Sequence, residues 1–341
     1  MIKIKYKTLL LCVAALLFLT LFSCMYMNST KAVSAQEEKS FIKWVDFSVS
    51  YEAMDKALKA DVSSIDDEVK LNWIELLSYL GARYGGNFAL YKSKDMDTII
   101  NKLKCGESIE SLTKDLKYYN YYFQAYTAVL GGFVGPYEIQ IDDVNNKGKK
   151  IWVQKYGIKA FCPIAGGYYY NHYDDFGNSR SYGFARVHLG NDLMGSVGTP
   201  IVAVETGRIE ALGWNQYGGW RIGIRSLDNK RYYYYAHLKK DHPYVKSLKE
   251  GDIVYAGDVI GYLGMTGYST KENVNNIKTP HLHFGMQLVF DESQKETLAE
   301  IWIDVYKIVN LLNNNRSSVS YNSETNEFSR IYNIKFHNVT R

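Results

Sequence analysis

Two histidines two residues apart, His281 and His283, are the residues of this chain best suited to chemistry. They lie in an apolar run, Thr279-Pro280-His281-Leu282-His283-Phe284-Gly285, that favours a strand. Side chains at positions i and i+2 of a strand share a face, so both imidazoles would point into one small volume. One ring could then bind a metal while the other handles protons. Taken alone, the triplet also fits two ordinary surface histidines.

Three further polar residues lie upstream in similar apolar, glycine-rich surroundings: His188, Asp192 and His237. His188 and Asp192 are four residues apart, so they share a face in either a helix or a strand. The glycine and asparagine between them favour extended chain. Three histidines outside such surroundings are interpreted as surface residues: His172, His242 and His337.

The chemistry that these residue types allow is metal-assisted hydrolysis. Two imidazoles and one carboxylate make a three-ligand zinc site with an open fourth position, where water loses a proton near neutral pH. Two further histidines would take that proton and stabilise the oxyanion. The chain has no matching set of cysteines and no His-Glu-x-x-His helix, which excludes a thermolysin-type site. Spacing alone does not decide whether His281 or His283 is the ligand.

The glycine-rich segments around these residues follow a recognisable order. They are His188-x-Gly190-x-Asp192, Gly198 to Ala203, Tyr235 to Leu238, Gly257 to Gly261, Thr266-Gly267 and His281 to Phe284. This order resembles the lysostaphin/LytM-type zinc metallopeptidases over about residues 161–288. The resemblance implies that His188, Asp192 and His283 bind one zinc ion per chain. It also implies that His237 and His281 are the catalytic pair.

The same resemblance implies an exported zinc metalloendopeptidase that hydrolyses peptide bonds of bacterial peptidoglycan, in cell wall remodelling or lysis. The alternative is a catalytically silent LytM-like scaffold that binds cell wall or a division or sporulation partner. Because all five chemical residues are present, we favour the enzyme. Two departures are an insert at 271–279, expected to be a longer loop beside the site, and Met265 in place of the usual asparagine.

Composition sets broad limits on the fold and the partners. A chain of 341 residues can hold two domains, and its 46% apolar fraction supports real cores. A net charge of +4 is too small to indicate nucleic acid as a partner.

Alternation places Tyr233 and Tyr235 on the face of His237, where we expect them to wall the groove. We expect Cys105 and Cys162 to be free thiols rather than a disulfide.

The N-terminus is predicted to be a targeting segment. Lys3, Lys5 and Lys7 precede residues 8–27, which carry no charge and are long enough to span a bilayer. Three interpretations remain open: an uncleaved membrane anchor, a signal peptide cleaved after Ala35, and a lipoprotein modified at Cys24. Each places the rest of the chain outside the membrane, at the cell envelope or beyond it.

Periodicity predicts an α+β multidomain protein, in which an N-terminal helical domain precedes a β-rich domain. The resemblance implies that this second domain is a mostly antiparallel β peptidase domain with a zinc groove. The expected divisions are 1–36 (signal or anchor), 37–150 (helical domain of unknown role), 151–292 (peptidase) and 293–341 (helix and mobile tail). Helices are expected at about 44–58, 66–84, 95–105, 108–130 and 296–312, with a polar linker at 142–150. Strands are expected at 199–204, 208–212, 220–224, 232–238, 253–254, 259–263 and 281–289.

Overall fold

The computed structural model describes residues 41–181, 185–295 and 298–336. The helices and strands below all belong to one unit, residues 42–341. The predicted targeting segment, residues 1–36, lies outside the described residues, as does His337. Among the described helices, none combines the length and the apolar character that crossing a membrane requires.

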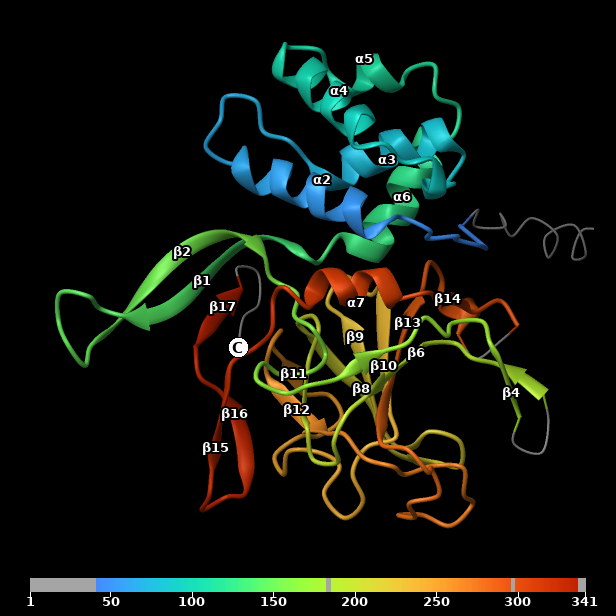
Figure 1. Ribbon diagram of the computed structural model, residues 1–341, viewed down its shortest axis with the longest axis vertical. Helices are drawn as coiled ribbons and strands as arrows, with labels where there is room; N and C mark the ends of the chain where they lie inside the picture. Colours follow the sequence, from blue (N-terminus) through green and yellow to red (C-terminus); the bar gives the residue numbers. More distant parts are fainter. Residues whose placement is uncertain (1–40, 182–184, 296–297, 337–341) are drawn as a thin grey trace, which may run out of the picture. The chain divides into compact units, whose positions relative to one another are not determined.

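The first part of this unit is helical (Figure 1). Its helices are α2 (Tyr51–Ser63), α3 (Trp73–Tyr84), the short 3-10 helix η1 (Phe88–Leu90), α4 (Ser93–Lys104), α5 (Ile109–Thr113) and α6 (Tyr119–Leu130). Side chains cap the first two, because Ser50 accepts a hydrogen bond from the N–H of Ala53 and Asn72 accepts from two N–H groups of α3. Gly85 ends α3 in the left-handed conformation, with φ of 60°.

Three predicted helices were wrong in extent. The helix expected at 44–58 spans Tyr51–Ser63 instead. The helix expected at 66–84 begins only at Trp73, because the Asp61 carboxylate and the Ser64 hydroxyl accept backbone hydrogen bonds from Trp73 and Leu71. These tertiary bonds hold the intervening residues in a turn. The helix expected at 108–130 is two helices, α5 and α6, separated by a turn at 114–118.

The polar segment predicted as a linker is the turn of a β hairpin. Strands β1 (Val134–Asp142) and β2 (Lys150–Ile158) pair antiparallel along their whole length. The Asp143 carboxylate closes the turn by accepting hydrogen bonds from the backbone N–H of Asn145 and the side-chain amide of Asn146. Polarity alone does not separate a hairpin turn from a linker, and this explains the error.

An eight-stranded antiparallel sheet forms the centre of the β region. Its strands run in the order β11-β8-β9-β10-β13-β6-β3, and β14 pairs with β13 outside this order. Their bounds are β3 (Asn171–His172), β6 (Asn191–Met194), β8 (Gly207–Asn215), β9 (Gly219–Ser226), β10 (Arg231–Ala236), β11 (Ile253–Val254), β13 (His281–Leu288) and β14 (Ile301–Ile303). Two smaller pairs complete this region: β4 (Ser179–Ser181) with β5 (Ala185–Val187), and β7 (Pro200–Val202) with β12 (Val259–Tyr262). The predicted strands and the α+β fold class are confirmed.

The C-terminal part differs from the prediction. The expected helix at 296–312 is strand β14 followed by a shorter helix, α7 (Tyr306–Leu312). The tail expected to be mobile contains β15 (Val319–Asn322), β16 (Glu327–Arg330) and β17 (Ile334–Phe336), and β17 pairs with β1. Arg316 and Ser317 fasten the start of this segment through hydrogen bonds to the carbonyls of Ala165 and Gly257. The partners lie far away in the sequence, so local composition gave no sign of them.

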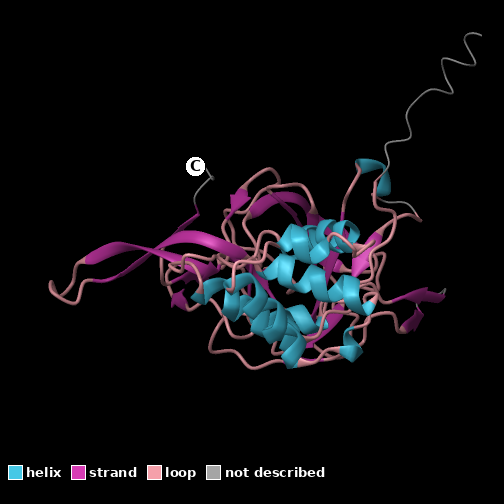
Figure 2. Ribbon diagram, turned by 90° about the horizontal axis from the view of Figure 1, so that it is seen from above, coloured by secondary structure: helices cyan, strands magenta, loops and turns pink. Residues whose placement is uncertain are grey.

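The helices and the sheet share one hydrophobic core. Met54 of α2, Leu77 of α3 and Tyr126 of α6 belong to the same buried cluster as Tyr233 of β10 and Phe284 of β13. Figure 2 shows most of the helices gathered into one group. Burial of both layers in a common core ties the position of the site-bearing strands to the helices.

Candidate metal centre

Neighbouring strands bring the predicted ligands together. Asp192 lies on β6 and His283 on β13, and the antiparallel register places these two residues directly opposite each other. His188 lies in the loop that leads into β6. Gly190, in the same loop, allows close packing, because a Cβ at this position would lie 2.8 Å from the His283 ring. The glycine noted between His188 and Asp192 is therefore needed for a close approach of backbone and ring.

The three side chains offer donor atoms at the spacing of a metal site. His188 Nε2 lies 2.8 Å from His283 Nδ1 and 3.1 Å from Asp192 Oδ1, and the last two atoms are 3.3 Å apart. In a tetrahedral zinc site with bonds of 2.0–2.1 Å, ligand atoms lie about 3.3 Å from one another. Two nitrogens and one carboxylate oxygen are also a donor set that zinc accepts. The residues present therefore fit a zinc ion.

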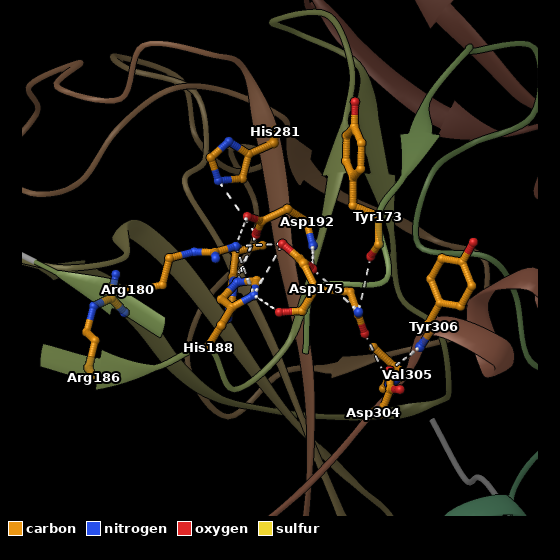
Figure 3. A network of polar contacts seen from close by, with 12 residues as sticks. Tyr173, Asp175, Arg180, Arg186, His188, Asp192, His281, Asp304, Val305 and Tyr306 are labelled. Carbon is orange, nitrogen blue, oxygen red and sulfur yellow. Dashed lines mark hydrogen bonds and ion pairs between the residues drawn. The ribbon is translucent and has the colours of Figure 1, made fainter. Parts of the chain in front are cut away.

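Two residues that the sequence did not single out, Asp175 and Arg180, hold this set (Figure 3). His188 donates its Nδ1–H to the Asp175 carbonyl at 3.0 Å, which leaves Nε2 directed at the other donors. The Asp175 carboxylate accepts the backbone N–H of Asp192 at 3.2 Å. Arg180 Nη2 lies 2.6 Å from Asp175 Oδ2 and 3.3 Å from Asp192 Oδ2. No local sequence signal marks Asp175 or Arg180, because their role depends on a turn that folds back onto β6.

Electrostatics keep the carboxylate charged. Burial would raise the pKa of Asp192, but hydrogen bonds from His188 and His283 hold that pKa well below its usual range. Burial likewise lowers the pKa of His188, but hydrogen bonds to Asp175 and to Asp192 outweigh burial and raise it to about 9. The pKa of His283 is lowered, chiefly by burial. The pocket therefore attracts positive charge, whether a proton or a metal cation.

A second pair of histidines lies beside the first set. The rings of His237 and His281 are 4.8 Å apart, and both side chains are nearly buried. His237 donates its Nδ1–H to the Thr266 carbonyl at 2.9 Å, and His281 donates its Nδ1–H to the Thr279 carbonyl at 2.8 Å. In the neutral rings each Nε2 is therefore free to accept a proton. Burial lowers the pKa of His237 well below its usual value.

The tyrosines expected to wall the groove are in the core instead. Tyr233 and Tyr235 are fully buried, and both pack against Phe284 on the opposite face of the sheet. Strand β10 ends at Ala236, and His237 has a left-handed φ of 63°, so the alternation does not continue to His237. Tyr234 faces the site, with its ring 5.8 Å from His283.

The predicted insert lies near the site and is fastened to neighbouring segments. The Asn273 side chain accepts a hydrogen bond from Trp220 Nε1 at 2.9 Å and donates one to Asp241 at 2.6 Å. Of the histidines interpreted as surface residues, neither His172 nor His242 is fully exposed. His172 packs on Tyr306 with ring centroids 4.5 Å apart, so that interpretation was wrong.

Both described cysteines, Cys105 and Cys162, are free, as predicted. Cys105 is exposed, whereas Cys162 is buried.

An antiparallel β fold that holds two imidazoles and a carboxylate beside a second histidine pair is the arrangement of a metal-dependent hydrolase. Residues 186–296 match the model of Peptidase family M23. This segment is therefore an M23 domain, and the predicted resemblance to lysostaphin/LytM-type peptidases is confirmed.

Curated relatives support the same family. An L-Ala–D-Glu endopeptidase of Bacillus subtilis (strain 168) is 40% identical over 131 residues, which cover 38% of this chain and 38% of the relative. Lysostaphin of Staphylococcus simulans is 40% identical over 99 residues, 29% of this chain and 17% of that protein. The chain therefore spans less than half the length of either relative.

A solved structure extends the likeness in fold beyond the matched segment. The crystal structure of a candidate glycyl-glycine endopeptidase lytM from Ruminococcus gnavus ATCC 29149 superimposes with a TM-score of 0.52. The superposition covers 81% of this chain and 92% of that one at 23% sequence identity. The shared fold therefore extends well beyond residues 186–296.

Proposed function

We propose that this protein is an exported zinc metalloendopeptidase that hydrolyses peptide bonds of bacterial peptidoglycan. The observation that carries the proposal is the convergence of His188, Asp192 and His283 at ligand spacing beside two histidines whose Nδ1–H groups bond backbone carbonyls. The names of two relatives, the L-Ala–D-Glu endopeptidase of B. subtilis and a peptidoglycan DD-endopeptidase of Vibrio cholerae, support peptidoglycan as the substrate class.

In this proposal His188, Asp192 and His283 hold the zinc ion. When bound, zinc supplies Lewis-acid activation of the scissile carbonyl and of the attacking water. Asp175 fixes the tautomer of His188 by accepting its Nδ1–H, so that Nε2 faces the metal position.

The second pair handles the protons. His237 is suited to accept the proton of the attacking water at Nε2, because burial favours its neutral form and the Thr266 carbonyl fixes its tautomer. His281 lies beside Asp192, with Nε2 3.7 Å from Oδ1, and is placed to hydrogen-bond the developing oxyanion. The two roles can also be exchanged, and single substitutions at each position test the assignment.

The test combines metal content with wall-lytic activity on purified peptidoglycan. The purified chain should retain about one zinc ion. His237→Ala should keep the zinc and lose roughly 10²- to 10⁴-fold of the activity. Since His237 has a left-handed φ of 63°, His237→Asn is a second variant that tolerates this backbone. His242→Ala, which removes a histidine hydrogen-bonded to Glu327, is the matched control.

Full activity in a metal-free preparation, or after loss of His237, would overturn the proposal. Zinc bound at unit stoichiometry without cleavage of any peptidoglycan would favour the alternative of a silent scaffold that binds cell wall or a partner. Mass spectrometry of the released muropeptides identifies the bond that is cut.

A further inference from the structure

A cavity of about 490 Å³ adjoins the metal centre on the face of the sheet that His283 occupies. Its floor includes Tyr232 and Tyr234 of β10, with Arg221 of β9 on one side and Gln287 of β13 on the other. The register of β10 aligns Tyr235 with both Ile222 and Phe284. One residue nearer the metal centre on each outer strand, Arg221 of β9 and His283 of β13 therefore lie at the same level on either side of β10. Two strand spacings separate them, or about 10 Å.

Three side chains that line this cavity carry buried donors without an acceptor among the described residues. The atoms are Arg186 Nε, Arg221 Nε and Gln287 Nε2. An unpaired buried donor is unfavourable by about 1–3 kcal/mol and is rare in native proteins. Three side chains with an unpaired donor therefore line the same cavity.

Arg221 differs from its neighbour on the same strand face. Arg225, four residues further on, forms two hydrogen bonds with Glu210, at 2.7 and 3.1 Å. Within the described part of the chain, the guanidinium of Arg221 has neither an ion pair nor a hydrogen bond. Because one arginine is neutralised and the other is not, structural pairing does not account for Arg221.

The acidic residues of the cavity are already engaged. Glu210 contacts Lys295 as well as Arg225, and Glu300 accepts a hydrogen bond from Trp302 Nε1 at 2.7 Å. Arg186 adds positive charge on the side nearest His237. Its guanidinium lies over the Tyr268 ring, 5.0 Å from the centroid, and that ring packs against His237. The cavity thus has an excess of cationic donors.

We infer that this cavity is a carboxylate subsite, in which Arg221, assisted by Arg186 and Gln287, binds an ionised carboxylate of the substrate peptide. The inference rests on the proposed function, because it assigns the substrate class of the same site. An extended peptide rises about 3.3 Å per residue, so the carboxylate lies within about three residues of the scissile bond. Acidic stem peptides satisfy this requirement, whereas an uncharged glycine bridge does not.

The test measures peptide binding without turnover. The full chain carrying His237→Asn is titrated with a synthetic stem peptide whose carboxylates are all free, and with twins in which one carboxylate at a time is a carboxamide. A pentaglycine acetylated at its N-terminus and amidated at its C-terminus serves as the uncharged comparison. One carboxamide twin should bind roughly 10- to 100-fold more weakly than the free acid, the value of a charge-assisted hydrogen bond. The position of that amide identifies which carboxylate is recognised.

Arg221→Gln should bring the ratio of the affinities for the free acid and its carboxamide twin to about one. Arg221→Lys should restore part of this ratio, because lysine keeps the charge but not the planar pair of donors. Arg208→Gln is the matched control. It removes a positive charge from β8, where Arg208 is exposed and bonds the Gly251 carbonyl outside the cavity. This control should leave the discrimination unchanged.

Equal binding of acid and amide, no measurable binding of either, or discrimination that survives Arg221→Gln would overturn the inference. The same peptides are then digested with the chain that has His237. Cleavage without discrimination refutes the carboxylate subsite and leaves the proposed function standing. Discriminating binding without cleavage of any peptide refutes the proposed function and leaves the subsite standing.

Discussion

The buried ion pair between Glu205 and Arg231 joins the helices to the sheet, and its loss should destabilise the protein. Arg231 is 1% exposed, and its Nε and Nη2 atoms lie 2.7 and 3.0 Å from the Glu205 carboxylate. Arg231 also donates to the carbonyl of Ala128 near the end of α6. The Tyr233 hydroxyl donates to Glu205 at 2.6 Å. Glu205→Gln keeps the size of the side chain and removes its charge.

The expected loss of unfolding free energy is about 3 kcal/mol. Removing one partner of a buried pair is unfavourable by about 3–5 kcal/mol, because the other charge remains buried. The lower end of this energy range applies here, since Arg231 keeps its ion pair with Asp228 at 2.7 Å and its hydrogen bond to the Ala128 carbonyl. The glutamine oxygen also still accepts one hydrogen bond, while its amide group faces the arginine donors.

Urea denaturation followed by circular dichroism measures this loss, and Asp97→Asn is the control. Asp97 pairs with Lys56 at the surface with 56% of its side chain exposed, so its substitution should change stability by no more than about 1 kcal/mol. Hydrogen exchange should also accelerate in α6 of the Glu205→Gln variant. A loss below about 1 kcal/mol, equal to that of the control, would refute the argument that this pair joins the two layers.

Two other substitutions test the metal set and the C-terminal segment. Asp175→Asn should weaken zinc retention by about 10- to 100-fold, measured by competition with a chelator, because it removes the carboxylate charge that pairs with Arg180 and lies 3.3 Å from His188 Nδ1; unchanged retention would contradict its positioning role. Burial raises the pKa of Glu327, but hydrogen bonds from Tyr262 and His242 outweigh burial and lower it below 4.5. The wild-type stability advantage over Glu327→Gln should therefore be full above about pH 5 and lost as the pH falls through the lowered pKa. Parallel stability curves of the two proteins between pH 3 and 7 would exclude this linkage.

The sequence predicted the strands from β7 to β13 because each is a short apolar run near glycine, but it did not predict β1 to β6 or β14 to β17. It also identified all five residues that the structure brings together, since their surroundings in the chain are distinctive. Asp175 and Arg180 were missed because their contacts depend on how one loop folds onto β6. The start of α3 was misplaced for a similar reason, because the side chains of Asp61 and Ser64 compete for the backbone.

The tyrosine that lines the groove could not be predicted from alternation, because the φ angle of one residue, His237, interrupts the strand pattern. Period-two alternation from His237 selects Tyr235 and Tyr233, and this would hold if β10 continued to residue 237. The left-handed φ of His237 turns its side chain to the other face of the sheet. Tyr234 therefore lines the cavity with His283, and its neighbours fill the core. A positive φ at histidine has no clear sequence signal, since histidine adopts it only occasionally.

The shared core decides how the helices can influence the site. Met54 and Tyr126 pack in one cluster with Tyr233 and Phe284, which flank the site-bearing positions of β10 and β13. A chain without residues 37–150 would expose this apolar surface and remove the Ala128 carbonyl from Arg231. Such a truncation would change the stability of the sheet as well as access to the site, so a change in activity would not by itself identify an inhibitory helical domain. Single substitutions at the junction, such as Glu205→Gln, separate the two effects because they leave the covering helices in place.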